Sequence, residues 1–130
     1  MTRCLPRQWG VSPRSERSGG GREVTLLGQN VTAYRWQDSL DFAGLLQRVA
    51  GVADLERIRF LTGHPCDMHR RLMETIAAEP KICPWLHVPA QSGSDRVLKR
   101  MKRHYRGEDY LVMVDDARRI RLVCCHEGVL

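Results

Sequence analysis

Residues 85–101, WLHVPAQSGSDRVLKRM, determine the fold class of this chain. Residues 85–88 are apolar and stand between two prolines, which predicts a short buried strand. Residues 89–93 are small and polar and form a loop, after which Ser94 or Asp95 can cap a helix. The buried side of that helix is predicted to consist of Val97, Leu98 and Met101. This order of strand, loop and helix is typical of a βα unit.

Two similar units precede this one in the chain. Residues 23–28 are short, apolar and β-prone, so they are predicted to be a buried strand, and residues 57–62 (RIRFLT) are predicted to be a second strand. Ser39 is the predicted N-cap of a helix between them, and Gly51 is the predicted residue just beyond its end. The inner face of this helix is predicted to consist of Phe42, Leu45, Leu46 and Val49.

The remaining segments continue the alternation. A helix capped by Asp67 and ending before Pro80 is predicted between the second and third strands. Its inner face would consist of Met68, Leu72, Met73 and Ile76. Residues 108–119 are predicted to be a further helix, and residues 120–125 a fourth strand. Strands alternating with helices predict an α/β fold with a parallel sheet.

The length and composition restrict the class of protein. A chain of 130 residues corresponds to about one domain, and 42% hydrophobic with 28% charged residues is a globular composition. No apolar run approaches the roughly 20 residues of a membrane helix, and residues 1–10 lack the apolar core of a secretory signal. Residues 1–22 consist mainly of Arg, Ser, Gly and Pro, so we expect a disordered tail outside the domain.

The formal net charge of +6 is concentrated in two places. Residues 1–22 contain five arginines and one glutamate, and residues 96–106 contain six basic residues and no acidic one. Such clusters are typical of surfaces that bind the phosphate backbone of a nucleic acid. A solvated helix face produces the same pattern, so the charge alone leaves both interpretations open.

The cysteines indicate reduced thiols. There are five of them at irregular spacing, and no export signal precedes them, which favours a cytoplasmic protein without disulfides. His64, Cys66 and His69 form an H-x-C-x-x-H cluster that could hold zinc. A structural zinc site uses four ligands and this cluster offers three, so the pattern favours a capped loop without a metal ion.

Function in parallel βα folds gathers in the loops that follow the carboxyl ends of the strands. Here these loops are residues 28–30, 62–65 and 89–94, and each is polar and contains a glycine. The third loop leads into a helix N-terminus, whose free N–H groups suit an anion or a carboxylate. We expect a binding site at this end of the strands, although ordinary turns have a similar composition.

Three segments resemble one family. They are VTLLGQNV at residues 24–31, RIRF at residues 57–60 with the following His64-Pro65, and LHVPAQSGSDRVLKRM at residues 86–101. They resemble the radical S-adenosylmethionine (SAM) methylthiotransferases, and specifically the tRNA 2-methylthioadenosine synthases. The resemblance implies a partial parallel (β/α) barrel of about three to four βα units at residues 23–121. Residues 122–130 lie outside it.

The resemblance also implies cofactors, a partner and site residues. S-adenosylmethionine is held at the strand ends, a 4Fe-4S cluster bound by three cysteines reduces it to a radical, and the substrate is an adenosine beside the tRNA anticodon. The residues implied for the cofactor are Gly28, Gln29, Asn30, Gln91, Ser92 and Ser94. The residues implied for RNA are Arg96, Lys99, Arg100, Lys102 and Arg103.

The chain departs from the family in its cysteines. The cluster motif C-x-x-x-C-x-x-C is absent, and thiolates are the ligands that such a cluster needs. We therefore expect this chain alone to be inactive, with no catalytic or metal-binding residue and with neither cofactor bound. The alternative is a non-catalytic basic RNA-binding module. Strands taken from a barrel also expose their edges, which predicts self-association.

Overall fold

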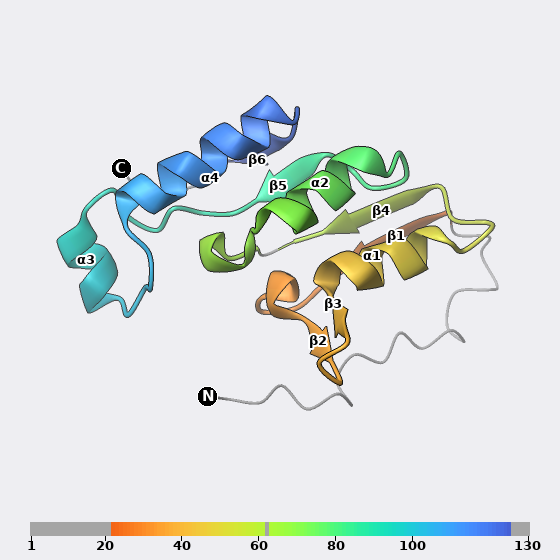
Figure 1. Cartoon of the computed structure of the whole chain (residues 1–130), viewed down its shortest axis with the longest axis horizontal. Helices are drawn as coiled ribbons and strands as arrows, with labels where there is room; N and C mark the ends of the chain where they lie inside the picture. The colour runs from red at the N-terminus through yellow and green to blue at the C-terminus, as the bar shows by residue number, and fades with distance from the viewer. Residues whose placement is uncertain (1–21, 62, 126–130) are drawn as a thin grey trace.

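The computed structural model describes residues 22–61 and 63–125 (Figure 1). Most of the predicted tail at residues 1–22, Thr62 in the second loop, and residues 126–130 lie outside this part. The described residues form four α-helices: α1 (Phe42–Ala50), α2 (Arg70–Ala78), α3 (Asp95–Arg100) and α4 (Gly107–Arg119). The strands are β1 (Glu23–Leu26), β2 (Arg35–Trp36), β3 (Leu40–Asp41), β4 (Arg57–Phe60), β5 (Trp85–His87) and β6 (Val123–Cys125). The same part of the chain also contains two 3-10 helices, η2 (Val31–Ala33) and η3 (Pro65–Asp67).

Four of the described strands form two parallel pairs. β1 pairs with β4 in the register Glu23 to Arg57, and β5 pairs with β6 in the register Trp85 to Val123. An isolated parallel bridge between Ile58 and Ile82 connects the two pairs. In this bridge both the backbone N–H and the carbonyl of Ile58 are hydrogen-bonded. The predicted α/β fold with parallel strands, including the fourth strand, is therefore confirmed. The described strands form separate two-stranded sheets, so a partial barrel is not established.

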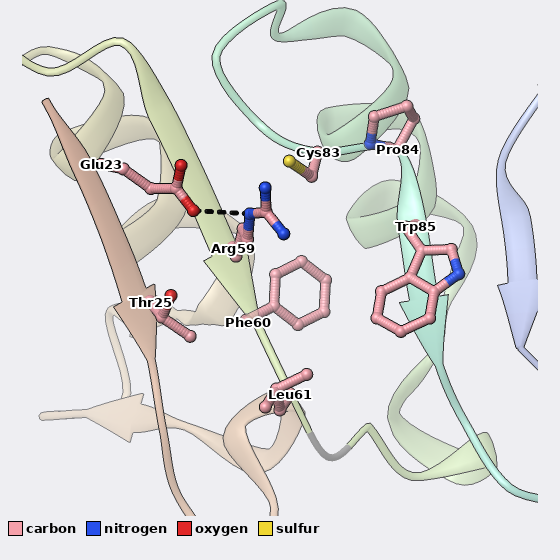
Figure 2. A pocket seen from close by; sticks show the side chains of 8 residues that line it. All are labelled: Glu23, Thr25, Arg59, Phe60, Leu61, Cys83, Pro84 and Trp85. Atoms are coloured by element: carbon pink, nitrogen blue, oxygen red, sulfur yellow. Dashed lines mark ion pairs between the residues drawn. The ribbon is translucent and has the colours of Figure 1, made fainter.

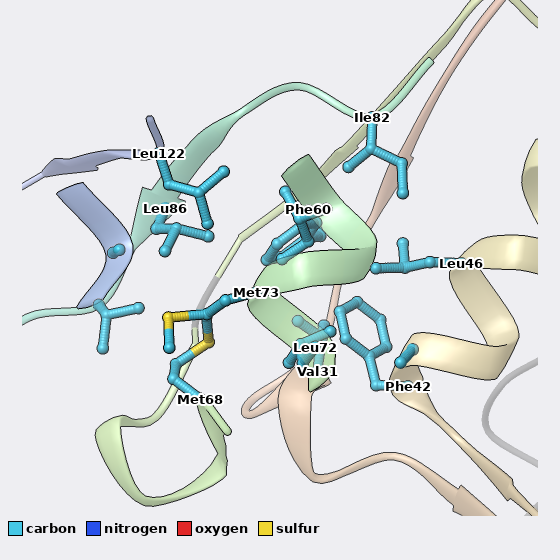
Figure 3. Packing of buried hydrophobic residues seen from close by; sticks show 14 of the residues in the cluster. Val31, Phe42, Leu46, Phe60, Met68, Leu72, Met73, Ile82, Leu86 and Leu122 are labelled. Atoms are coloured by element: carbon cyan, nitrogen blue, oxygen red, sulfur yellow. The ribbon is translucent and has the colours of Figure 1, made fainter. Parts of the chain in front are cut away.

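One face of these strands packs on helices. Burial alternates along β4, where Ile58 and Phe60 are buried and the two arginines are exposed, as expected for a strand with one covered face. Phe60 meets Phe42 of α1 edge to face at 5.2 Å between ring centroids. Figure 3 shows this core, which α1, α2 and the segment after α4 supply with further apolar side chains, including Leu46, Leu72, Met73 and Leu122.

Two predicted helix caps are wrong by two residues. The N-cap of α1 is Asp41, whose carboxylate accepts a hydrogen bond from Gly44 N at 2.9 Å, because Ser39 is used in the turn between β2 and β3. The N-cap of α2 is His69, whose Nδ1 accepts from Leu72 N at 3.2 Å, because Asp67 belongs to η3. Gly51 ends α1 with φ −70°, so it does not adopt the left-handed conformation of a C′ glycine.

The short helix α3 is less buried than its pattern predicts. Leu98 is 1% exposed, but Val97 and Met101 are 37% and 43% exposed, because the six-residue helix extends away from the core (Figure 1). Within the described ranges, no helix is both long enough and apolar enough to span a membrane.

Candidate functional site

The loops after β1, β4 and β5 meet in one small cavity. Its volume is about 150 Å³. The lining residues come from these loops and from the turn after α3, and they are Gln29, Asn30, Gly63, His64, Pro65, Pro89, Gln91, Arg103 and Tyr105. The strand ends therefore gather three of the six residues that the resemblance implied for a cofactor, namely Gln29, Asn30 and Gln91.

A buried threonine ties the first two loops together. Thr32 is 2% exposed, and its hydroxyl donates to Asn30 Oδ1 at 2.6 Å and accepts from His64 N at 3.1 Å. Asn30 Nδ2 in turn donates to Asp67 Oδ2 at 2.8 Å. The amide of Asn30 is thus fixed in orientation on the cavity wall. Thr32 was missed in the sequence because a lone threonine after a strand carries no distinguishing pattern.

Gly63 permits the second and third loops to approach each other. Its N–H donates to His87 O at 3.0 Å. A Cβ added to this residue would lie 2.9 Å from Val88 Cγ2, which is closer than real Cβ atoms come. The lack of a side chain at this position therefore permits the close approach of the two strand ends.

The other three implied cofactor residues do not line the cavity. Gly28 is exposed just after β1. Ser92 Oγ accepts a hydrogen bond from Ser94 N at 3.1 Å, and Ser94 is the N-cap of α3 without a side-chain capping bond. The two serines therefore shape the loop that enters α3, beside the cavity wall formed by Gln91.

Two aromatic rings close the cavity on the side of η3. Tyr105 is 7% exposed, its hydroxyl donates to Ala90 O at 2.8 Å, and burial raises its pKa. The His64 ring meets the Tyr105 ring edge to face at 5.6 Å. Burial lowers the pKa of His64, opposed by the nearby Asp67 carboxylate, so the imidazole is neutral at pH 7. His64 belongs to the second of the predicted strand-end loops, whereas Tyr105 was not predicted for the site.

The five basic residues implied for RNA separate into two groups. Four of them, Arg96, Lys99, Arg100 and Lys102, are exposed on α3 and just after it. Arg103 is half-buried instead and lines the cavity. The structure thus keeps a compact exposed basic surface on α3 and turns one arginine away from it.

The residues of the predicted zinc alternative have local partners. His64 Nδ1 accepts from Cys66 N at 3.2 Å, and His69 Nδ1 caps α2. Cys66 Sγ lies 3.5 Å from His104 O. Among the described residues there is no group of three or more His, Cys, Asp or Glu that could hold a metal ion.

A second, larger cavity lies on the strand face opposite the helices (Figure 2). Its volume is about 610 Å³, and it is formed where β4 and β5 diverge. The Glu23 carboxylate pairs with Arg59 Nε at 2.6 Å on one side, and the Trp85 indole, which is 45% exposed, stands on the other. This face is open and mainly apolar, and the Glu23 carboxylate pairs with Arg57 as well, at 3.6 Å.

Curated relatives match most of this chain. A tRNA-2-methylthio-N(6)-dimethylallyladenosine synthase of Endomicrobium trichonymphae is 48% identical over 99 residues, which cover 76% of this chain and 23% of the relative. The protein of the same name from Rhodopirellula baltica is 54% identical over 99 residues, covering 74% and 21%. That of Geobacter metallireducens is 48% identical over 110 residues, covering 83% and 25%.

The extent of these matches defines what is shared. The chain spans about a fifth to a quarter of the length of these curated relatives. A family model described as the Radical SAM superfamily matches residues 14–130, which include every described strand and helix and all the residues that line the strand-end cavity. The parallel βα units and the polar strand ends agree with this match, and the chain belongs to the radical SAM superfamily.

Proposed function

We propose that this chain is the S-adenosylmethionine- and tRNA-contacting part of a tRNA methylthiotransferase, active in the cytoplasm. The observation that carries the proposal is the convergence of Gln29, Asn30 and Gln91 from two separate loops on one cavity at the strand ends. The names of the relatives at 48–54% identity support the reaction and the substrate.

The residues of the cavity suit the amino-acid end of S-adenosylmethionine. The amide side chains of Gln29 and Gln91 can donate to a carboxylate and accept from an ammonium group. The volume of about 150 Å³ is small, so only part of the cofactor would enter this cavity. Gly28, Ser92 and Ser94 would border the mouth. In this superfamily the bound cofactor supplies a carbon-centred radical after one-electron reduction.

The 4Fe-4S cluster does not fit the described residues. Such a cluster requires three or more thiolates, whereas the described free cysteines are Cys66 and Cys83 and no group of metal-binding side chains surrounds either. Burial raises the pKa of Cys66, with Asp67 and Asp109 adding to the effect, so its thiol stays protonated at neutral pH. We therefore assign no reaction step to this chain alone.

The cavity itself contains no cysteine. Its walls consist of side-chain amides, backbone, two prolines, two aromatic rings and one guanidinium. The shape of the cavity therefore does not depend on a 4Fe-4S cluster. The sequence led us to expect neither cofactor on this chain. On the geometry we now propose that S-adenosylmethionine binding persists without the cluster, at reduced affinity.

Titration of the full chain with S-adenosylmethionine tests this part of the proposal. Q29A and Q91A should each weaken binding measured by calorimetry, by about 10- to 150-fold, since each removes one hydrogen bond to a charged group of about 1.5–3 kcal/mol. Q47A is the matched control, because Gln47 is exposed on α1 and outside the cavity. Equal effects of all three substitutions, or no binding by the unsubstituted chain, would refute the assignment.

The exposed basic surface of α3 supports contact with tRNA. Arg96, Lys99 and Arg100 are exposed on one short helix, and no ion pair within the described ranges involves them. Basic side chains without an ion-pair partner can neutralise phosphates and release the counterions of a nucleic-acid backbone. A non-catalytic RNA-binding module is the second candidate function, because this surface could bind RNA without any cofactor.

Filter binding of tRNA at several salt concentrations tests the basic surface. The affinity should fall linearly with the logarithm of the salt concentration, and the slope should decrease by about 0.7–0.9 for each phosphate contact removed by R96Q, K99Q or R100Q. R118Q on α4 is the control, because Arg118 is also exposed but lies on another helix. RNA binding without S-adenosylmethionine binding would favour the non-catalytic module.

The open strand face supports a partial barrel. Parallel sheets are normally covered on both faces, yet Glu23, Thr25, Arg59 and Trp85 are exposed opposite the helices. In the proposed barrel this face would line the interior. β1 and β6 each have only one hydrogen-bonded neighbour among the described strands, so we also propose self-association through these edges. Sedimentation velocity of the full chain at high concentration tests this, and a single monomeric species would exclude self-association.

A further inference from the structure

Trp36 of β2 is an exposed tryptophan that neither the core nor the strand-end cavity uses. Its side chain is 40% exposed, and it lines neither of the two cavities described above. Among the described residues the other exposed tryptophan is Trp85, which stands on the open strand face. A single exposed apolar side chain needs no explanation by itself. The evidence for a role lies in how the chain holds this ring.

The hairpin of β2 and β3, residues 35–41, closes in a strained turn directly after Trp36. Ser39 N donates to Trp36 O at 3.2 Å, and Gln37 and Asp38 between them have φ 48° and 55°. This is the pattern of a type I′ turn, whose two central positions favour asparagine and glycine. The described non-glycine residues with positive φ are Gln37, Asp38, Gln91, Lys102 and Arg121, and the first two are the adjacent pair. Strain of this kind concentrates at ligand sites, where the surrounding structure maintains it.

The hairpin is anchored on α1, so the turn and the ring are held in place. Asp41 at its end is the N-cap of α1, and the carboxylate also pairs with Arg71 of α2. Leu40 lies over Gly44, where an added Cβ would come within 2.7 Å of Leu40 Cδ1. Leu40 is the cross-strand partner of Trp36, and such partners lie on the same face of a hairpin. Leu40 therefore supports the indole beside α1, and the rest of the ring is open to solvent.

The hairpin stands beside the strand-end cavity. Only Tyr34 separates it from η2, and Thr32 of η2 is hydrogen-bonded to Asn30 and His64 on the cavity wall. Figure 1 shows the hairpin and α3 on opposite sides of the loops that follow β1 and β4. An RNA strand that crosses the mouth of the cavity would therefore have the basic surface of α3 on one side and the hairpin on the other.

The charges of the hairpin suit a nucleobase better than a phosphate. Arg35 is its one basic residue, whereas Asp38 and Asp41 are acidic. Asp41 is paired with Arg71, but Asp38 is exposed at the turn and belongs to no ion pair within the described ranges. A carboxylate repels a phosphate, yet it accepts hydrogen bonds from the amino groups of bases. Every base also has a π-face that can stack on an indole.

We propose that the hairpin is a base-binding platform for RNA, on which an unpaired nucleobase of the tRNA substrate stacks on the Trp36 indole. Unpaired bases in RNA are commonly recognised by stacking on aromatic side chains. The side chains of Gln37 and Asp38 are exposed at the tip and can hydrogen-bond to the edge of that base. This inference rests on the proposed function, because it adds a base contact to the backbone contacts proposed for α3.

Filter binding of tRNA to the full chain separates a base contact from a phosphate contact. W36L should weaken binding by about 5- to 150-fold, the effect of losing one stacked base. It should leave the salt slope unchanged, because it removes no charge. W36F should fall between W36L and the unsubstituted chain, since a phenyl ring still stacks. W85L is the matched control and should bind tRNA as the unsubstituted chain does, because Trp85 is 45% exposed on a different face. Circular dichroism melts show whether the variants are folded.

Tryptophan fluorescence reports the stacking directly. The chain has three tryptophans, so W9F combined with W85F leaves Trp36 as the only one. Oligoadenylate should quench the fluorescence of this variant, because a base that stacks on the indole changes its surroundings. An abasic oligonucleotide of the same length carries the phosphates without the bases, so it should leave the fluorescence unchanged.

The inference is overturned if W36L binds tRNA as tightly as the unsubstituted chain, or if it lowers the salt slope as the α3 variants should. An altered association state of W36L with unchanged tRNA affinity would assign the hairpin to a contact between copies of the chain. If the unsubstituted chain does not bind tRNA, the proposed tRNA contact fails on its own. The fluorescence titration then decides the inference. Quenching by oligoadenylate alone supports the platform, whereas equal quenching by the abasic oligonucleotide, or none by either, overturns it.

Discussion

Replacement of Gly63 by alanine tests whether β4 and β5 must approach closely at their carboxyl ends. The added Cβ would lie 2.9 Å from Val88 Cγ2, and 3.5 Å from both His87 O and Thr32 Cγ2. Val88 is 1% exposed and Thr32 is 2% exposed, so neither methyl group can move into solvent. Part of the fold must therefore shift, and the atoms that shift are those that position the strand-end cavity.

The expected cost follows from two opposing terms. Adding a methylene-sized group to a packed interior costs about 1–3 kcal/mol. Replacing glycine with alanine restricts the unfolded chain and recovers about 0.4–1 kcal/mol. We therefore expect G63A to lower the free energy of unfolding by about 1.3 kcal/mol, the difference between the middles of the two ranges. With a urea m-value of about 2 kcal/mol/M, the unfolding midpoint should fall by about 0.5–1 M.

Urea denaturation followed by circular dichroism measures this shift, and a second glycine provides the control. A Cβ at Gly93 would have no heavy atom within 4 Å, so G93A should leave the midpoint unchanged or raise it slightly. V88A added to G63A removes the opposing methyl groups, so the pair should cost less than the sum of the single substitutions. Equal midpoints for G63A and G93A would show that the close approach is not required.

Three further substitutions test other parts of the fold by the same denaturation assay. The hydrogen bond from Gly44 N, with the Arg71 guanidinium nearby, holds the pKa of Asp41 below its usual value. D41A should therefore cost about 1 kcal/mol at pH 7, and the difference should disappear as the pH falls below about 4; a pH-independent cost would contradict this. Y110F removes a buried donor to Val88 O at 2.9 Å and should cost about 1–2 kcal/mol. K102G relieves the left-handed strain and should raise stability by up to about 1 kcal/mol, whereas a loss would show that the lysine side chain matters more.

The elements of the fold were predictable because their patterns are strong. Each helix repeats apolar residues at helical spacing, and the parallel strands are short segments in which apolar residues recur, in β4 alternating with arginine. The β2–β3 hairpin was not predicted, since two-residue strands have no periodicity and the turn relies on Gln37 and Asp38 at positive φ. The predicted N-caps of α1 and α2 were two residues from the observed ones for a related reason. Ser39 and Asp41 are both capping residues, and only the geometry of the preceding turn selects between them.

The candidate site was predictable only in part. Gln29, Asn30 and Gln91 were implied correctly as neighbours, because the carboxyl ends of parallel strands lie at one edge. Arg103 was assigned to the RNA-binding surface and Tyr105 was missed, since the position of both depends on the path of the chain after α3. That path is set by Lys102 in a conformation that a lysine rarely adopts. The local sequence offers no glycine or asparagine that would have marked the turn.

The contacts that hold the cavity connect it to the strand ends and the helix-covered core. Thr32 joins the first two loops, Gly63 N reaches His87 O, and Tyr105 and Tyr110 donate to the backbone just after β5. None of these bonds involves the exposed strand face that carries Arg59 and Trp85. The shape of the strand-end cavity therefore depends on the buried side of the sheet alone. Ligand binding there should persist whether or not another part of a barrel covers the open face, whereas the association state should change when that face is covered.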